Sequence, residues 1–366
     1  MHTLRKTSEL RATAQKDAEG PGETPRVARG SARGSGGVRA LVLLACGVIA
    51  ACTTSEAHAP PPPAKAPAPG PSAPAAAAST PARHAAAAGP SAGPSAARPE
   101  APLGPVTAVY PWGPSASAPA DRLDGRFRAP PAGFTRVSAP PGSFAAFLRT
   151  LPLRPEGSPV VDYRGNRLYD DGRHPNIVAV ADLDVGDKDL QHCADAIIRL
   201  HAEWRYGRGD RDLTYRAVSG QPLSYQGWVA GDRPVVVGKD LVIRRAASAR
   251  KDDHAGLRRW LDDVFAWAGT ASLEREGKRV SSLSEVVAGD FFVMSGAPFG
   301  HAVLVLDVAK AEDGRSALLL GQSYMPAQTF QVLAHEGSAW FIVNPGDASV
   351  TTPFWRPFPA STLRRL

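Results

Sequence analysis

The pattern of hydrophobic and polar positions changes character near residue 105. Before that point the chain has almost no periodic apolar positions, and after it segments with helix and strand spacing follow one another. All seven Trp, all seven Tyr and all twelve Phe lie after residue 105. A stretch of about 260 residues is long enough to bury a full hydrophobic core. We therefore predict one globular domain over residues 106–366.

The clearest helical pattern covers residues 190–206. Asp189 is the predicted N-cap and Gly207 the predicted stop. The apolar face at helical spacing consists of Leu190, Cys193, Ala194, Ile197, His201 and Trp204. Arg199 and Glu203 lie four positions apart, a spacing typical of a solvated ion pair on a helix surface.

Two further helices are predicted, a short one at 144–151 and a longer one at 254–267 that ends before Gly269. The inward positions of the longer helix are Leu257, Leu261, Val264, Phe265 and Ala268. Residues 213–248 are predicted to form short strands and loops.

Four apolar runs predict strands: 176–183, 290–294, 302–308 and 317–320. Asp313-Gly314 is expected in the connection between the last two. Runs without alternation indicate strands that are covered on both faces. The order of elements predicts an α+β fold in which the helix bearing Cys193 packs on an antiparallel sheet.

An apolar run of eleven residues at 41–51 follows Arg33 and Arg39. It is too short to span a bilayer as a helix and fits the hydrophobic part of a secretory signal. Ile49-Ala50-Ala51-Cys52 resembles the lipobox of bacterial lipoproteins, which implies lipidation of Cys52 and removal of residues 1–52. The alternatives are a plain secretory signal cleaved elsewhere and a chance apolar run in a cytoplasmic protein.

Residues 53–105 contain runs of Pro and Ala, such as 60–63 and 75–78. Such a composition predicts a disordered, semi-extended tether. The expected partner is a membrane, reached through the lipid on Cys52. Lipoproteins that stay at the inner membrane often carry Asp directly after the lipidated cysteine, whereas this chain has Thr53 there. We therefore expect the anchor in the outer membrane, with the domain facing the periplasm.

Net charge and cysteine content reduce the number of function classes that the sequence supports. The net charge is +7, but residues 1–52 carry eight Lys/Arg and four Asp/Glu, so about +3 remains after processing and nucleic-acid binding is not predicted. Cys46 and Cys52 belong to the export segment, which leaves Cys193 as the single thiol of the domain. The sequence shows no phosphate loop and no metal-ligand spacing, so no cofactor is predicted.

Three residues suggest nucleophilic chemistry. Cys193 lies in the first turn of its helix, where the helix dipole favours a thiolate. His301 opens one strand, and Gln322 follows the next, placed to accept from the imidazole N–H. The alternatives are a core thiol, a structural histidine and a strand-end hydrogen-bonding residue. Asp307 is discounted as the partner of His301, because it lies about 20 Å farther along the same strand.

Segments 287–293 and 300–305 resemble the Gly-Asp and Gly-His motifs of the NlpC/P60 cell-wall cysteine hydrolases. Cys193 resembles the helix-start cysteine of the same papain-like superfamily, although Ala194 stands where those hydrolases commonly carry Ser. The 108 positions between Cys193 and His301 imply an insertion at 207–285. The resemblance implies a cysteine peptidase or amidase acting on peptidoglycan peptides. Gln191, or the backbone N–H of Cys193, would then hold the oxyanion.

A longer resemblance covers about residues 152–365 and concerns a bacterial family known as domain of unknown function 4846. It rests on the segments 151–153, 189–195, 265–270, 300–303 and 322–328. This resemblance implies no activity. A non-catalytic envelope module that uses the same cleft for binding therefore stands beside the hydrolase hypothesis.

Overall fold

The computed structural model describes residues 108–113, 121–297 and 299–366. The predicted signal segment, Cys52 and the tether at 53–105 lie outside the described residues. Among the described residues, no helix has both the length and the apolar character needed to cross a membrane.

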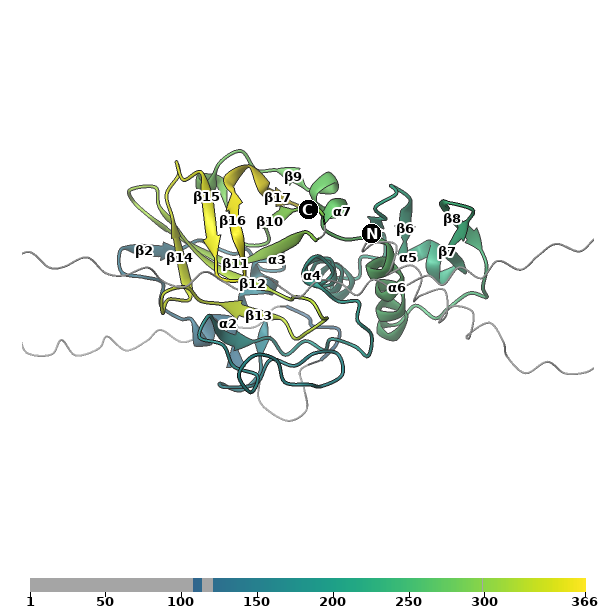
Figure 1. Ribbon diagram of the computed structural model, residues 1–366, viewed down its shortest axis with the longest axis horizontal. Helices are drawn as coiled ribbons and strands as arrows, with labels where there is room; N and C mark the ends of the chain where they lie inside the picture. Colours follow the sequence, from purple (N-terminus) through teal and green to yellow (C-terminus); the bar gives the residue numbers. More distant parts are fainter. Residues whose placement is uncertain (1–107, 114–120, 298) are drawn as a thin grey trace, which may run out of the picture. The chain divides into compact units, whose positions relative to one another are not determined.

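A nine-stranded antiparallel sheet forms the centre of the fold (Figure 1). Its strand order is β4-β13-β12-β11-β10-β17-β9, with β14 also paired to β12 and β2 also paired to β11. The strands are β2 (Phe134–Arg136), β4 (Ile177–Val180), β9 (Lys278–Arg279), β10 (Phe291–Met294), β11 (His301–Ala311), β12 (Ser316–Gln322), β13 (Gln331–Leu333), β14 (Trp340–Val343) and β17 (Leu363–Arg365).

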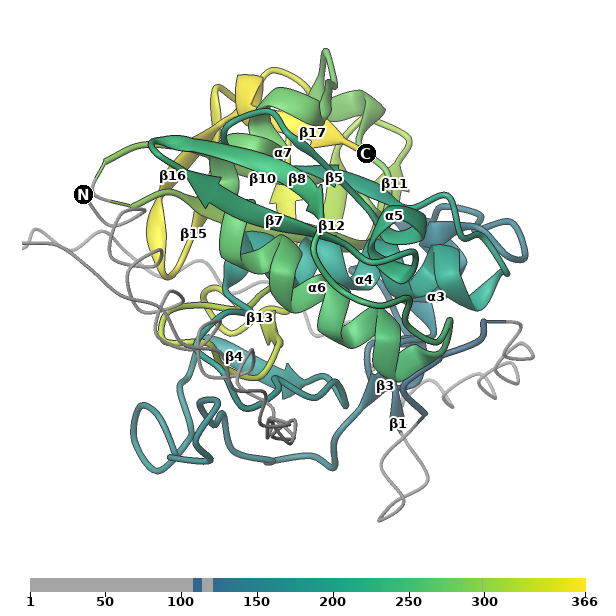
Figure 2. The ribbon, with the colours of Figure 1, turned by 90° about the vertical axis from the view of Figure 1, so that its right-hand side faces the viewer.

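Helix α4 lies against β11 and separates the sheet from α6 (Figure 1). Seen from the side in Figure 2, α6 lies in front of α4, and the β7–β8 hairpin crosses over it. The helices are α2 (Leu123–Arg126), α3 (Phe144–Arg149), α4 (Cys193–Gly207), α5 (Tyr225–Val229), α6 (His254–Trp267) and α7 (Thr270–Glu276), with 3-10 turns at Leu283–Glu285 and Ala360–Thr362.

Four two-stranded sheets complete the described part of the chain. Their strands are β1 (Asp121–Arg122) with β3 (Pro152–Leu153), β5 (Thr214–Arg216) with β6 (Pro222–Ser224), β7 (Asp232–Val237) with β8 (Asp240–Arg245), and β15 (Ser349–Thr352) with β16 (Trp355–Pro359).

The two central strands, β11 and β12, are buried on both faces, as their unbroken apolar runs predict. Leu304 of β11 packs with the helices in one apolar cluster. Its neighbour Val305 packs in a second cluster with Phe358. The α+β class and the antiparallel sheet are confirmed.

Helix α4 begins at Cys193, three residues later than the apolar pattern predicts. The N-cap is His192, and the prediction of Asp189 in that position is wrong. Asp195 explains the shift, because its carboxylate at the third helical position accepts from the backbone N–H of His192 at 3.1 Å. Cys193 is consequently the first residue of the helix.

Helix α6 spans the predicted residues and is capped by Asp253. Gly269 ends it and is also the N-cap of α7, a helix that the sequence pattern did not indicate. Within 213–248 the short strands are present, together with the unpredicted helix α5.

Gly321 is the residue of β12 that permits the tightest packing. A Cβ built there would lie 2.6 Å and 2.7 Å from the Phe330 ring and 2.8 Å from a methyl group of Leu306. We predict that Gly321→Ala lowers the free energy of unfolding by about 2 kcal/mol, because a packed core resists added volume. Urea denaturation of Gly346→Ala is the control, since nothing lies within 4 Å of a Cβ there. Equal unfolding midpoints for the two variants would contradict this packing.

Candidate functional site

Cys193 opens helix α4 and lines a cavity of about 190 Å³. Only 7% of the residue is exposed. The first turn of a helix presents N–H groups and a positive dipole end, both of which favour a thiolate. The site therefore starts from a thiol at a position suited to nucleophilic chemistry.

His301 and Gln322 lie at one end of the sheet, on the neighbouring strands β11 and β12. His301 Nε2 donates to Gln322 Oε1 at 2.7 Å. With Nε2 protonated, Nδ1 carries the lone pair and is the basic atom of the ring. Burial lowers the pKa of His301 to about 4, against the opposing effect of the Gln322 hydrogen bond. The imidazole is therefore neutral at pH 7 and able to accept a proton.

Tyr324 packs against the imidazole and lies within electrostatic range of the thiol. Its ring centroid lies 4.9 Å from that of His301. Burial raises the pKa of Tyr324, and the negative charge of a Cys193 thiolate raises it further. Cys193 and His301 therefore both influence one tyrosine, Cys193 through its charge and His301 through ring packing, although they are 108 positions apart in the chain.

The loops on either side of the site are joined directly. Ser323 Oγ lies 3.2 Å from the backbone carbonyl of Gln191. On the other side of the same loop pair, Asp189 Oδ1 accepts from the Ala327 N–H at 2.7 Å and lies 2.8 Å from His192 Nε2. These contacts fix the start of α4 against the residues that follow β12.

The cavity walls combine apolar side chains with small residues. Val218, Trp267 and Met325 supply apolar surface, and Phe299 lies at an exposed position. Gly300 precedes His301, and a Cβ there would collide with the Met294 carbonyl and the Thr270 hydroxyl. The absence of a side chain at Gly300 keeps this end of β11 close to α7.

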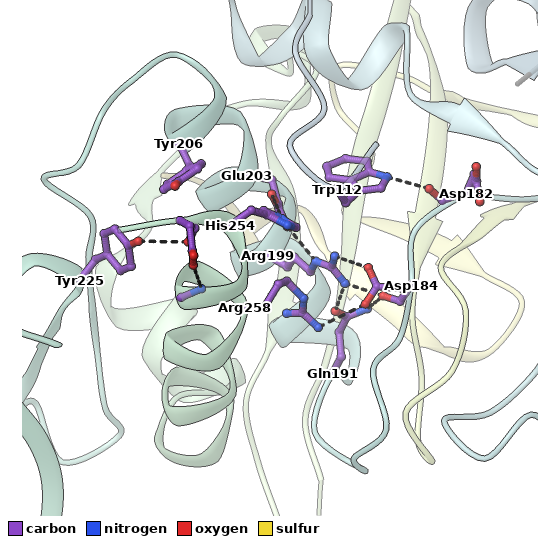
Figure 3. Close-up of polar contacts among 12 residues, drawn as sticks. Trp112, Asp182, Asp184, Gln191, Arg199, Glu203, Tyr206, Tyr225, His254 and Arg258 are labelled. Atoms are coloured by element: carbon purple, nitrogen blue, oxygen red, sulfur yellow. Dashed lines mark hydrogen bonds and ion pairs between the residues drawn. The ribbon is translucent and has the colours of Figure 1, made fainter. Parts of the chain in front are cut away.

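The side chain of Gln191 is directed to a different set of partners from those that an oxyanion donor needs (Figure 3). Its Nε2 donates to the Asp184 carbonyl at 3.3 Å, and its Oε1 accepts from Arg199 Nη1 at 2.8 Å. Gln191 is absent from the residues that line the Cys193 cavity. The structure thus joins His301 to Gln322, places Cys193 in the wall of a cavity that neither of them lines, and directs the Gln191 carboxamide elsewhere.

Arg199 and Glu203 are both fully buried, so the prediction of a solvated pair is wrong. Arg199 Nε donates to Glu203 at 3.2 Å and Nη2 donates to Asp184 at 2.6 Å. Glu203 also lies 3.0 Å from His254 Nε2 at the start of α6. The apolar stripe of α4 does not reveal this burial, because α6 covers the face that the pattern marks as polar.

Three further residues border the site, and the sequence pattern does not identify them as site residues. His192 is only 8% exposed. Tyr324 packs on His301, and Asp189, predicted as the helix cap, instead contacts Ala327 and His192. The contact between Asp189 and Ala327 joins residues 138 positions apart, and no local pattern records such a contact. In the described part of the chain, no three His, Cys, Asp or Glu residues are grouped to hold a metal ion.

The buried pair on α4 yields a stability prediction. Glu203→Gln should lower the free energy of unfolding by about 3 kcal/mol, because it removes the fully buried one of the two carboxylates that pair with the Arg199 guanidinium. The matched control is Asp171→Asn, which breaks an exposed Arg167–Asp171 pair of the same spacing and should leave the urea midpoint nearly unchanged. Equal losses in the two variants would contradict the role assigned to burial.

Comparison with known proteins identifies a family without a function. No curated protein and no solved structure gives a significant match. A family model described as domain of unknown function (4846) matches residues 123–365, which is more than half of the chain. The chain belongs to this family.

Proposed function

We propose that this protein is a lipid-anchored cysteine hydrolase of the cell envelope, of the peptidase or amidase type. The observation that supports the proposal best is the placement of Cys193. Cys193 opens a helix, lines a cavity and lies within electrostatic range of Tyr324, and the same tyrosine packs on an imidazole that Gln322 orients. Nucleophile, base and orienting group then come from three separate elements of one sheet end.

In this mechanism the Cys193 sulfur attacks the carbonyl carbon of an amide or ester, and its proton passes to His301 Nδ1. His301 then protonates the departing amine or alcohol. Water hydrolyses the thioester and returns the thiol. Gln322 holds Nε2 protonated throughout and thereby keeps Nδ1 available.

The oxyanion requires donors other than the Gln191 side chain, which binds Asp184 and Arg199. Backbone N–H groups in the first turn of α4 are suited to this task, since the start of a helix presents them without intrahelical acceptors. We propose that these N–H groups stabilise the negative charge that develops on the substrate carbonyl oxygen.

A papain-like or NlpC/P60-like arrangement with an insertion accounts for the order of the elements. The cysteine helix comes first, and the histidine and glutamine strands follow as neighbours. The predicted insertion at 207–285 contains α5, α6, α7 and the hairpins β5–β6 and β7–β8. Peptide stems of peptidoglycan are the proposed substrates, on the strength of the proposed envelope location and of family analogy.

One observation favours the second candidate, a binding module without catalysis. His301 is 2% exposed, and the rings of Trp355 and Phe358 lie 5.1 Å and 6.1 Å from it, besides that of Tyr324. Such surroundings also suit a structural histidine. The two candidates differ in the reactivity of the Cys193 thiol.

Thiol reactivity separates the two candidates. With Cys46 and Cys52 replaced by Ser, the native chain should react with iodoacetamide at pH 7 faster than the same chain in urea. His301→Ala should slow the native reaction, and His335→Ala, at a half-exposed turn, should not. Hydrolysis of muropeptides should fall by about 10²- to 10⁴-fold in His301→Ala. Labelling of Cys193 only after unfolding would overturn the proposal.

The pH profile provides an independent check. Because burial lowers the pKa of His301 to about 4, its neutral basic form persists well below the ordinary histidine range. Hydrolysis by the wild type should therefore be retained near pH 5 and decline as the pH falls through about 4. A decline centred near 6.5 would show that the base is a solvated histidine instead.

The anchor is tested separately from the chemistry. In a bacterial host, the full chain should incorporate radiolabelled palmitate and sediment with the outer membrane. Cys52→Ala should abolish both, whereas Cys46→Ala should preserve both. Recovery of unlabelled protein in the periplasm from the wild-type chain would refute the lipid anchor and leave the Cys193 chemistry unaffected.

A further inference from the structure

The β7–β8 hairpin carries valine side chains that lie outside the hydrophobic core. Alternate residues of a strand share one face, so Leu241 and Ile243 of β8 lie on the same side. Both belong to the apolar cluster that includes helix α6. The valines of the two strands belong to neither apolar cluster of the described chain, and they are Val235, Val236, Val237 and Val242.

The exposed end of the hairpin is its turn. Val236 and Val237 are 38% and 42% exposed, and the turn residues 238–240 that follow them are exposed at every position. The hairpin lies on the outer side of α6, away from the nine-stranded sheet (Figures 1 and 2). Residues 236–240, called the hairpin tip below, can therefore meet another surface without any change in the core.

Positive charge is concentrated around the same tip. Residues 232–251 carry six Lys/Arg and two Asp, a net charge of +4, which exceeds the +3 of the whole chain after residue 52. Two of these cations are paired, Arg245 with Asp232 at 2.8 Å and Lys251 with Asp253 at 3.6 Å. Exposed cations that form no ion pair with another described residue are Lys239, Arg244 and Arg250.

The remaining acid of the hairpin offsets only part of this charge. Asp240 directly follows Lys239 in the turn. Arg244 lies opposite Arg233 in the hairpin, so two cations are neighbours across the strands. The surface around the exposed valines therefore keeps an excess of positive charge, and an anionic partner would relieve it.

Exposed valines beside unpaired cations fit a bilayer of anionic lipids better than the other partners of this charge. Lipid phosphates attract the cations, and short apolar side chains enter the boundary of the acyl chains. A second copy of the chain would bring the same cations to a shared strand edge, where like charges repel. Residues 232–251 contain no aromatic side chain on which the bases of a nucleic acid could stack.

We propose that the β7–β8 hairpin binds the surface of an anionic lipid bilayer. Val236 and Val237 enter the boundary between headgroups and acyl chains, while Lys239, Arg244 and Arg250 face the lipid phosphates. The contact depends neither on a lipid at Cys52 nor on the chemistry proposed for Cys193. It would bring the described domain to a membrane surface through its own side chains.

A fluorophore at the tip tests insertion directly. In the full chain, Cys46, Cys52 and Cys193 are replaced by Ser, and Val237→Cys is labelled with a nitrobenzoxadiazole dye. Vesicles of equimolar phosphatidylglycerol and phosphatidylcholine should raise the emission by about twofold or more as the dye enters the apolar boundary. Lipids with brominated acyl chains should then quench it. Vesicles of phosphatidylcholine alone should change little.

The matched control for the fluorophore is Ile342→Cys on β14. Ile342 is 43% exposed, which is close to the exposure of Val237, and it lies in a different part of the fold. The dye at this position should show neither the rise in emission nor the quenching. The apolar segment at 41–51 is present in both labelled chains, so it cannot produce a difference between them.

Charge variants measure the contribution of the cations. Lys239→Gln and Arg244→Gln should each weaken sedimentation with the anionic vesicles by about fivefold, and high salt should release the wild type. Arg315→Gln is the matched control, because it removes one exposed cation from a different turn. It should leave the affinity for vesicles nearly unchanged.

Four results would overturn the proposal. The first is an equal response of the dye at positions 237 and 342. The second is equal vesicle affinity of Lys239→Gln, Arg244→Gln and Arg315→Gln. The third is tighter binding of a DNA oligonucleotide than of the anionic vesicles. The fourth is a dimer that Val237→Ser dissociates, which would show that a second copy covers the tip. If a charge variant fails to fold, the two labelled chains decide the question.

Discussion

The fully buried guanidinium of Arg199 is the interaction on which the placement of the candidate site depends. Its donors bind Glu203 within α4, and the loop before α4 at Asp184 and Gln191. Glu203 in turn contacts His254 of α6. A buried charge must keep these partners, so the loop, α4 and α6 hold one arrangement. The position of α4, and with it that of Cys193, is therefore held by contacts that begin about two turns further along the helix.

The sequence pattern predicts the elements better than it predicts how they end and what covers them. Helix α6 follows its pattern closely, because its cap residue and apolar spacing are local features. The start of α4 does not, because Asp195 and the contact between Ser323 and Gln191 decide it. The second of these joins residues 132 positions apart. Hydrophobic spacing cannot record such a contact, and so Asp189 resembles a cap when the sequence is read alone.

The candidate site shows the same difference between features that local sequence patterns predict and features that long-range contacts decide. The contact between His301 and Gln322 follows from strand order, since β11 and β12 are antiparallel neighbours and the end of one lies beside the beginning of the other. The side-chain direction of Gln191 could not be predicted, because it depends on the burial of Arg199. Residue types at strand ends therefore identify which groups can meet, and the buried polar network decides which of them are available.

Helix α6 gives the insertion a role beyond that of a spacer. Trp260 and Asp263 line a second cavity, of about 280 Å³, whose other walls come from β6, α5 and the β7–β8 hairpin, while Ala266 and Trp267 line the cavity of Cys193. Asp263 and Trp267 are separated by about 6 Å along the helix axis, and His254 at its start is fastened to Glu203 of α4. A rigid helix that forms a wall of both cavities and is anchored to the cysteine helix cannot shift at one cavity without shifting at the other. Any ligand that repositions α6 would therefore alter the wall beside the thiol, which gives the two cavities a physical means of coupling.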